Sequence, residues 1–423
     1  MDKSIKFKYI LFTLLTGIVT GIFIVIYSIL TKFLSFLLFL GNPYENISNL
    51  PWWYIYLIPT ISILIVNYLI SLDKSVKEYG VAEIAQAIEQ NKLIFTWKSL
   101  ILKIIASSLS LASGFAVGNE GPSAAIGAMV AEKFHKIYNL PKKLLKVSIS
   151  VGASGGIAAI FVSPITGIMF AIENIAYEFV RDFAGYLILA SVVAFSIALY
   201  FLEPLIFNYS AGKFVEYRNI FAGILFIPVI TIFIFFYLAL KEKILRFLNN
   251  LLIKKFEKYK NFVFALIGGF VIGSVLLISP YAGFSGHELV NILINDKLHL
   301  AYMIIFMIII LRIIATSVSI YANAVGGIFI TLMSIGALVG YGYAQMFNNF
   351  FPNMSIEPFY FAAIGAALFM GVNMKLPLTA LVVSLEITYD YNVIVPTGIL
   401  YILVSFLISR KFNLHKMIFR REK

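Results

Sequence analysis

The stretch Gly118-Asn119-Glu120-Gly121-Pro122 decides how this chain is interpreted, because it places a carboxylate between two strongly apolar segments. A carboxylate at membrane depth costs at least about 2.5–3.5 kcal/mol, so it is kept where an ion, a proton or a cavity requires it. The glycines and the proline interrupt the local helix and free backbone N–H groups beside the carboxylate. The stretch therefore predicts a site that binds an anion and can also hold a proton.

Composition places the chain among polytopic membrane proteins. Apolar residues make up 61% of it and charged residues only 13%, far from the averages of soluble domains. Several stretches are long enough, or nearly so, to cross a hydrocarbon core that needs about 20 residues: 9–41, 52–72, 184–201, 220–240, 262–279, 301–322 and 393–409. Shorter apolar pieces are interpreted as broken or partial spans buried in protein: 100–117, 123–131, 147–173, 326–340 and 361–387. We predict an all-α fold with many tilted and broken helices.

The distribution of basic residues indicates how the chain lies in the membrane. The formal net charge is +12, and Lys and Arg gather in 142–146, 241–260 and 410–423. By the positive-inside rule these segments and the basic N-terminus are expected in the cytoplasm, and 42–54 is expected at the outer interface. Anionic lipid accounts for these juxtamembrane charges better than nucleic acid does. We expect a multi-pass protein of the inner (plasma) membrane.

Several features are missing from the sequence. It has no cysteine, so disulfide and thiol chemistry are excluded. The first apolar run is too long for a cleavable signal peptide and is interpreted as the first span. The sequence has four histidines: His135, His287, His299 and His415. They are too scattered for a metal site, and no metal or cofactor is expected. We expect one transmembrane domain over 1–423, with neither a soluble domain after residue 423 nor a cytosolic regulatory domain.

The two halves of the chain resemble each other in register. Lys103, Ala106, Ser108, Ser110 and Gly118 match Arg312, Ala315, Ser317, Ser319 and Gly327, and each pair is 209 residues apart. Gly152, Pro164, Thr166 and Glu173 match Gly365, Pro377, Thr379 and Glu386, and each pair is 213 apart. Repeats in transporters place the substrate site at their interface near the midplane. We expect two repeats, about 1–212 and 213–423; the sequence leaves open whether they are inverted or parallel.

Three motifs together resemble the chloride channel and transporter (CLC) family. They are the pentapeptide at 118–122, the segment Gly326-Gly327-Ile328-Phe329, and Glu386-Ile387-Thr388 leading to Tyr391 and Pro396. The motifs occur in order, and the resemblance covers almost the whole chain. It implies an all-helical fold of two inverted repeats, and a homodimer with one anion pathway in each subunit.

The resemblance also implies roles for particular residues. Glu120 matches the gating glutamate, whose ionised carboxylate competes with the anion and whose protonated form vacates the site. Ile328 and Phe329 match positions whose backbone N–H groups coordinate the anion at a helix start. Tyr391 matches the tyrosine whose hydroxyl closes the inner side of the central site. Asn119 and Gly121, on either side of Glu120, are assigned to the same anion site.

Three positions depart from the common family pattern. Asn119 stands where the family has an arginine, and Asn174 stands where its chloride/proton antiporters have an internal, proton-donating glutamate. The first selectivity motif, Gly-Ser-Gly-Ile-Pro, is reduced to 79–83. Tyr79 takes the serine position without a gap, and Val81 takes it with a two-residue deletion. We favour Val81, because that alignment keeps the preceding glycine.

These departures resemble the fluoride-exporting branch of the family, and they make chemical sense. Fluoride is smaller and more strongly hydrated than chloride, so its site needs concentrated N–H donors rather than a pocket sized for the larger ion. The Asn119 amide either supplies such a donor or stabilises the turn. We predict a fluoride/proton antiporter, with a chloride/proton antiporter or a passive chloride channel as alternatives.

Other polar residues have more than one interpretation. Lys103 and Arg312, inside apolar segments, either raise the potential for an anion or satisfy carbonyls at a broken helix. Glu173 and Glu386 are expected to be structural caps. The stretch 283–287 contains a serine and a histidine, but no histidine lies inside an apolar span where it could form a buried dyad with a serine. An intramembrane hydrolase is therefore a remote alternative, and we predict that the protein is not an enzyme.

Overall fold

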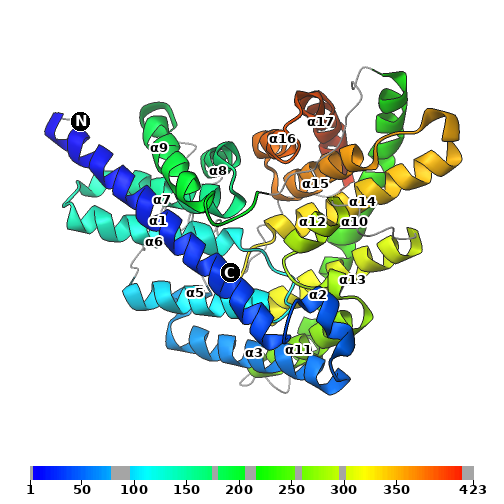
Figure 1. The fold of residues 1–423 in the computed structure, drawn as a ribbon, viewed down its shortest axis with the longest axis horizontal. Helices are drawn as coiled ribbons and strands as arrows, with labels where there is room; N and C mark the ends of the chain where they lie inside the picture. The colour runs from blue at the N-terminus through cyan, green and yellow to red at the C-terminus, as the bar shows by residue number, and fades with distance from the viewer. Residues whose placement is uncertain are drawn as a thin grey trace. The chain divides into compact units, whose positions relative to one another are not determined.

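The computed structural model describes residues 3–77, 96–173, 180–204, 216–252, 260–294 and 302–411, which form helices and no strand (Figure 1). The first half of the chain holds α1 (Lys3–Leu38), α2 (Pro43–Asn46), α3 (Trp52–Leu72), α5 (Trp97–Ala112), α6 (Glu120–Ile137), α7 (Leu145–Phe161), α8 (Pro164–Ala171) and α9 (Val180–Ala198). The second half holds α10 (Tyr217–Leu252), α11 (Lys260–Ile278), α12 (His287–Ile294), α13 (Tyr302–Tyr321), α14 (Phe329–Phe350), α15 (Pro358–Met374), α16 (Pro377–Glu386) and α17 (Ile394–Lys411). The predicted all-α class is confirmed.

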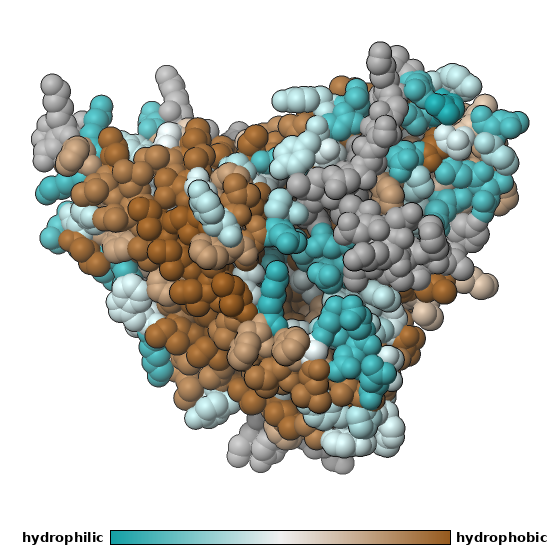
Figure 2. Space-filling model, viewed as in Figure 1, coloured by the Kyte–Doolittle hydropathy of each residue, from teal (hydrophilic) through white to brown (hydrophobic). Residues whose placement is uncertain are grey.

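Eight helical segments among the described residues are long and apolar enough to cross a membrane. The first of them includes most of α1, whose outer face is apolar: Phe7 is 71% exposed and Phe36 is 61% exposed. Figure 2 shows apolar side chains gathered over α1 and the helices beside it. Exposed apolar area on this scale suits contact with lipid, because soluble proteins rarely expose large contiguous apolar patches. The chain is a multi-pass membrane protein.

Two of the predicted broken spans break at residues that occupy equivalent positions in the two halves. The stretch 147–173 divides into α7 and α8 at Val162, and 361–387 divides into α15 and α16 at Lys375. Both residues adopt the left-handed conformation, with φ of 50° and 59°. A proline two residues later, Pro164 or Pro377, begins the next helix in each half. Proline suits a first helical turn, because N–H groups there have no intrahelical acceptor and the N–H that proline lacks costs no hydrogen bond.

Two expectations about helix breaks are wrong. The stretch 326–340 is not interrupted, because α14 runs for 22 residues from Phe329 and the break precedes it. Gly121 and Pro122 do not break a helix either; they lie in the first turn of α6. The irregular backbone is instead 113–119, between α5 and α6.

The chain packs as two compact units. The first comprises Met1–Leu205, Leu245–Glu288 and Ile314–Thr331, and the second comprises Ile206–Ile244, Leu289–Ile313 and Leu332–Lys423. In the first unit α6 crosses α7 so closely that a Cβ on Gly127 or Gly152 would collide with the carbonyl of the other. In the second unit Gly336 and Gly365 show the same reciprocal approach. Small residues allow such close crossings in membranes, and these two glycine pairs are repeat-related. The expected repeat boundary near residue 212 lies outside the described residues.

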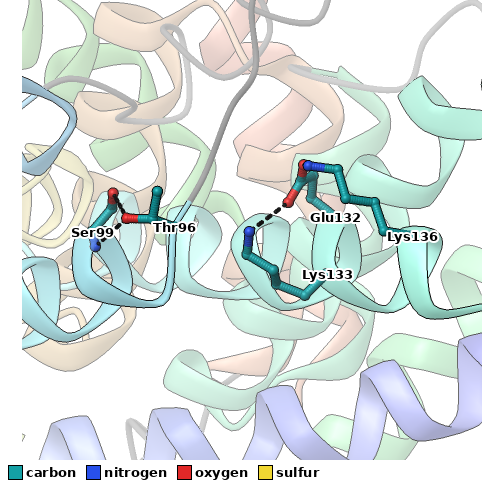
Figure 3. Close-up of polar contacts among 5 residues, drawn as sticks. All are labelled: Thr96, Ser99, Glu132, Lys133 and Lys136. Atoms are coloured by element: carbon teal, nitrogen blue, oxygen red, sulfur yellow. Dashed lines mark hydrogen bonds and ion pairs between the residues drawn. The ribbon is translucent and has the colours of Figure 1, made fainter.

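A polar junction connects the end of α3 to the start of α5. The Asp73 carboxylate accepts hydrogen bonds from the Ser75 N–H at 2.9 Å, the Ser75 hydroxyl at 2.7 Å and the Ser99 hydroxyl at 2.5 Å. Thr96 caps α5 by accepting the Ser99 N–H at 2.9 Å (Figure 3). Burial raises the pKa of Asp73, but the hydrogen bonds from Ser99 and Ser75 outweigh it and hold this pKa below its ordinary value.

We expect Asp73→Ala to lower the thermal stability of the purified protein at neutral pH. Hydrogen bonds to a charged group contribute about 1.5–3 kcal/mol, and the variant loses those that Asp73 accepts. Because the folded-state pKa is depressed, this stabilisation is present above the unfolded-state pKa and is lost as pH falls through the folded-state pKa. Melting temperatures in detergent should therefore differ at neutral pH and converge at an acidic pH below the folded-state pKa. An equal difference at both pH values would contradict the assignment.

Candidate functional site

Two irregular segments at repeat-related positions build the site. Residues 113–119 connect α5 to α6, and residues 322–328 connect α13 to α14. Each segment turns at a residue with positive φ: Gly114 at 98° and Asn323 at 65°. These residues are 209 apart, as the repeat requires. Glycine and asparagine are the residues that adopt this conformation at the lowest cost.

The two segments are hydrogen-bonded to each other in a symmetric pattern. The Gly118 N–H donates to the Gly327 carbonyl at 2.7 Å, and the Gly327 N–H donates to the Gly118 carbonyl at 2.8 Å. The Ala116 N–H donates to Ser319 Oγ at 3.1 Å, and the Val325 N–H donates to Ser110 Oγ at 3.0 Å. In each case the 209-residue offset converts the residues of one contact into those of the other. The two segments are therefore joined at positions that correspond under the predicted repeat.

The Glu120 side chain lies across this junction. Glu120 begins α6, is 2% exposed, and its Oε1 accepts a hydrogen bond from the Phe329 N–H, the first residue of α14. Its Oε2 is buried and has no hydrogen-bond partner among the described residues. The carboxylate therefore lies at the N-termini of two helices, where partial positive charge favours an anion.

Glycine at two positions makes room for the carboxylate. A Cβ on Gly118 would collide with both carboxylate oxygens of Glu120, and a Cβ on Gly327 would collide with Oε1. These are the two glycines that pair across the junction. The close approach of the two backbones and the space for the carboxylate therefore depend on the same two glycines.

The Phe329 ring fixes the donor. It is fully buried and contacts Phe161 of α7 at 4.8 Å and Phe170 of α8 at 5.4 Å between ring centroids. Aromatic pairs at this separation are favourable, and they hold the start of α14 against the first half of the chain. The N–H that contacts Glu120 is thereby preorganised.

The other predicted site residues are placed as follows. Asn119 precedes α6, is half-buried and makes no capping hydrogen bond with its side chain, while Gly121 is buried in the first turn. Ile328 is half-buried directly before α14. Tyr391 lies in the second unit and is 76% exposed. Tyr79, Val81 and Asn174 lie outside the described residues. The anion-binding and proton-transfer roles of all these residues stay predictions.

The charged pairs that repeat across the two halves also have defined positions. Lys103 is 1% exposed in α5, and Arg312 is fully buried in α13. Glu386 is the last residue of α16, and Glu173 follows α8; both are half-buried. Burial of a base in each half matches both interpretations given to Lys103 and Arg312, so the geometry of these residues does not separate them.

The expectation that no histidine takes part in a buried dyad is wrong. His135, near the end of α6, is 5% exposed, and its Nδ1 lies 2.9 Å from Ser148 Oγ of α7. The sequence interpretation missed it because His135 follows charged residues and seemed to belong to a loop. The neighbouring Glu132 is also buried and forms ion pairs with Lys133 and Lys136 (Figure 3).

This histidine and serine do not form a hydrolase site. The Ser148 hydroxyl is fully buried and also lies 3.2 Å from the Tyr9 hydroxyl, within a cluster that includes Phe12, Leu144 and Val147. A nucleophile needs access to its substrate, and this one is enclosed by packed side chains. The described residues likewise contain no group of three or more His, Cys, Asp or Glu that could hold a metal ion.

Sequence relatives of the chain are bacterial exchangers. It is 26% identical over 332 residues to the H(+)/Cl(-) exchange transporter ClcA of Vibrio cholerae serotype O1 (strain M66-2), covering 75% of this chain and 68% of that protein. It is also 26% identical over 328 residues to the ClcA of Salmonella paratyphi B (strain ATCC BAA-1250 / SPB7), covering 75% and 67%.

Solved structures share the fold. A slow cyanobacterial Cl-/H+ antiporter superposes with a TM-score of 0.82 at 19% identity, covering 98% of this chain and 99% of that one. A CLC-type fluoride/proton antiporter superposes with a TM-score of 0.75 at 17% identity, covering 94% of both chains. The CLC-like fold expected from the motifs is therefore confirmed. The model of one family, described as voltage gated chloride channel, matches residues 58–410. The chain therefore belongs to the voltage gated chloride channel (CLC) family, whose members are transporters and not enzymes.

Proposed function

We propose that this chain is a proton-coupled anion antiporter that exports fluoride in exchange for protons. One observation carries the coupling of an anion to protons: the Glu120 carboxylate accepts the Phe329 N–H at the start of α14. Its oxygen stands in for a bound halide, because a halide would accept a hydrogen bond from the same donor. A carboxylate and an anion cannot share that donor, so occupancy by one excludes the other.

The proposed cycle couples the two fluxes through this exclusion. A protonated Glu120 is a weaker acceptor than the carboxylate, because charge-assisted hydrogen bonds are roughly twice as strong as neutral ones. It therefore leaves the Phe329 N–H to the anion. When Glu120 releases its proton, the carboxylate returns and displaces the anion. Inward movement of protons then drives export of the anion.

The fluoride assignment rests on three sequence positions. Asn119 replaces an arginine, Tyr79 or Val81 replaces the serine, and Asn174 replaces the internal glutamate. Loss of the serine removes a chloride contact, and selectivity is a difference between two binding free energies. The solved fluoride/proton antiporter shares the fold at 17% identity, which is compatible with the assignment.

Chloride/proton exchange is the second candidate function. It is favoured by the sequence relatives, which are named H(+)/Cl(-) exchange transporters, and by the cyanobacterial Cl-/H+ antiporter with the same fold. The gate formed by Glu120 and Phe329 suits either anion. Transport measurements therefore have to separate the two candidates.

We expect purified protein in liposomes to transport fluoride at least about tenfold faster than chloride under the same inward-directed pH gradient. That ratio corresponds to a difference of about 1.4 kcal/mol between the two anions. Both fluxes are measured with ion-selective electrodes on one protein preparation, and protein-free liposomes give the background. Equal rates, or faster chloride, would replace the fluoride assignment by chloride/proton exchange.

Restoring the serine and the arginine of the common family pattern tests the selectivity assignment in the opposite direction. We expect Val81→Ser combined with Asn119→Arg to raise chloride flux relative to fluoride, because it returns the missing hydroxyl and charge. Tyr79→Ser combined with Asn119→Arg tests the ungapped alignment. If neither pair changes the ratio, these positions do not set selectivity.

The remaining parts of the proposal follow from the family. With Asn174 in place of a second acid, we propose that protons reach the cytoplasm through water or through a larger excursion of Glu120. We also propose a homodimer in the inner membrane, with its basic loops and termini in the cytoplasm near anionic lipid. No cofactor or nucleic acid takes part in this mechanism.

A further inference from the structure

A chain of hydrogen bonds connects α3 to the turn that begins the segment 322–328. Lys77 Nζ donates to Asn323 Oδ1, and Asn323 Nδ2 donates to Asn67 Oδ1 of α3 at 2.8 Å. Asn67 Nδ2 then donates to the Ala322 carbonyl at 3.0 Å. All four residues belong to the first compact unit, which also contains the start of α14.

Lys77 fixes the direction of this chain. An ammonium group donates hydrogen bonds and cannot accept them, so the oxygen of the Asn323 amide faces Lys77 and its nitrogen faces Asn67. The Asn67 oxygen accepts from that nitrogen, and the Asn67 nitrogen donates to backbone carbonyls. Its two acceptors are Ala322 at 3.0 Å and Ile63 of its own helix at 2.9 Å. Each amide therefore has one orientation that satisfies its neighbours.

The turn at Ala322 and Asn323 is buried against two helices. The two residues are 0% and 6% exposed, and Asn323 adopts a φ of 65°. A Cβ on Gly268 of α11 would lie 2.4 Å from the Ala322 Cβ, so α11 packs directly on the turn. Asn67 binds the same turn from α3. Because α3 and α11 also pack on each other, the two helices form one support for the turn.

The repeat-related turn in the segment 113–119 is supported in another way. Gly114 stands at the position that corresponds to Asn323, and its carbonyl accepts the Phe284 N–H at 3.0 Å. Glycine has no side chain, so this support is a contact between backbones. In the segment 322–328 the support passes through the Asn323 amide. The second turn therefore uses a side chain as well as a left-handed conformation.

We infer that Asn67, acting through Asn323, is a positioning residue for the anion-binding N–H of Phe329. The inference rests on the proposed function, in which an anion takes this N–H when Glu120 leaves it. While Glu120 is bound, its carboxylate itself restrains the N–H. Once it has left, the other contacts of the segment have to keep the donor in place, because a preorganised donor binds an anion without a cost of rearrangement. The link to Asn67 is one of these contacts.

The experiment measures anion flux in liposomes without a pH gradient, over a series of fluoride concentrations and again with chloride. Each variant is made in the Glu120→Gln background, where a carboxylate does not compete for the site. Asn67→Leu removes both hydrogen bonds of the amide to the turn. Asn323→Gly keeps a residue that favours positive φ, as Gly114 does, but removes the link. It also keeps the test valid if Asn67→Leu does not fold.

Asn348→Leu is the matched control. Asn348 lies near the other end of α14, is half-buried like Asn67, and also binds the backbone of another segment with its amide. Its Nδ2 donates to the Ile356 carbonyl at 2.9 Å, and its Oδ1 accepts the Ile356 N–H at 2.7 Å. The variant loses the same kind of contact without touching the segment 322–328.

We expect Asn67→Leu and Asn323→Gly each to raise the half-saturating anion concentration about 10- to 100-fold and to change the maximal flux much less. The factor is the loss typical of removing a group that orients a metal ligand. Combining the two substitutions should add little, because both break one network. Asn348→Leu should leave the half-saturating concentration unchanged.

Two outcomes would overturn the inference: an unchanged half-saturating concentration in Asn323→Gly, or a loss of maximal flux alone in Asn67→Leu, which a purely structural role would give. The proposed function is tested separately, by pH-driven uptake in the protein that retains Glu120. Absence of that uptake would overturn antiport, whereas the anion concentrations report on the donor alone.

Discussion

Glu120→Gln is expected to abolish anion uptake driven by a pH gradient, down to the rate of protein-free liposomes, while downhill anion flux persists. The amide has nearly the shape of the protonated carboxyl group, but it cannot release a proton. It also accepts the Phe329 N–H less strongly than a carboxylate, since a charge-assisted hydrogen bond is about twice as strong as a neutral one. An anion should therefore displace it readily. The measurement is uptake into liposomes with and without an imposed pH gradient.

Glu132→Gln is the matched control for this substitution. Glu132 lies in the same helix, is 1% exposed and is equally a buried glutamate, but its partners are Lys133 and Lys136 rather than a backbone N–H of α14. We expect this variant to retain coupled uptake. Full uphill uptake by Glu120→Gln would exclude a mechanism in which one carboxylate serves as both gate and proton carrier.

The parts of the fold that follow from local chemistry were predictable from the sequence. Apolar runs predicted the long helices, and the 213-residue offset paired Pro164 with Pro377, each of which begins a helix in the structure. The 209-residue offset indicated which residues correspond, and Glu120 stood out because an acid among apolar residues is costly. These features depend on residues near in sequence or on a simple count between positions.

The contacts between the corresponding segments were not predictable. The offset pairs Ser110 with Ser319, but the structure shows that each serine accepts an N–H from the opposite segment, at Val325 and Ala116. Sequence correspondence states which residues are equivalent and not which ones touch. The reciprocal bonds between Gly118 and Gly327 depend on the path of both chains through the junction.

The hydrogen bond between the Tyr27 hydroxyl of α1 and the Ser107 hydroxyl of α5 was not predictable for a similar reason. A tyrosine in an apolar helix and a serine in another have no local signal, because Tyr and Ser are common in this chain and pack in helices everywhere. Only the approach of α1 to α5 brings the two hydroxyls within 2.7 Å of each other. His135 was wrongly assigned to a loop, because the residues beside it are polar. In the structure the packing of α6 on α7 buries it.

Gly118→Ala should uncouple transport, because its methyl group fills the space that the Glu120 carboxylate occupies. The added Cβ would lie 2.6 Å from the carboxyl carbon of Glu120 and closer still to both oxygens. Gly118 does not have a positive φ, so alanine is tolerated by the backbone itself. Overpacking costs about 1–3 kcal/mol. This cost shifts the equilibrium about 5- to 150-fold away from the conformation in which the Glu120 carboxylate binds the Phe329 N–H. We expect pH-driven uptake to fall by that factor and downhill anion flux to rise.

Two comparisons show whether the effect of Gly118→Ala acts through Glu120. Gly185→Ala is the control for adding a methyl group, because a Cβ on Gly185 of α9 meets nothing within 4 Å; it should leave both fluxes unchanged. The second comparison adds Gly118→Ala to Glu120→Gln. Residues that act as one unit are not additive, so the double variant should show the same downhill flux as Glu120→Gln alone, measured in the same liposomes. A further change in the double variant, equal to that caused by Gly118→Ala in the unsubstituted protein, would show that Gly118 supports the backbone pairing with Gly327 rather than the carboxylate.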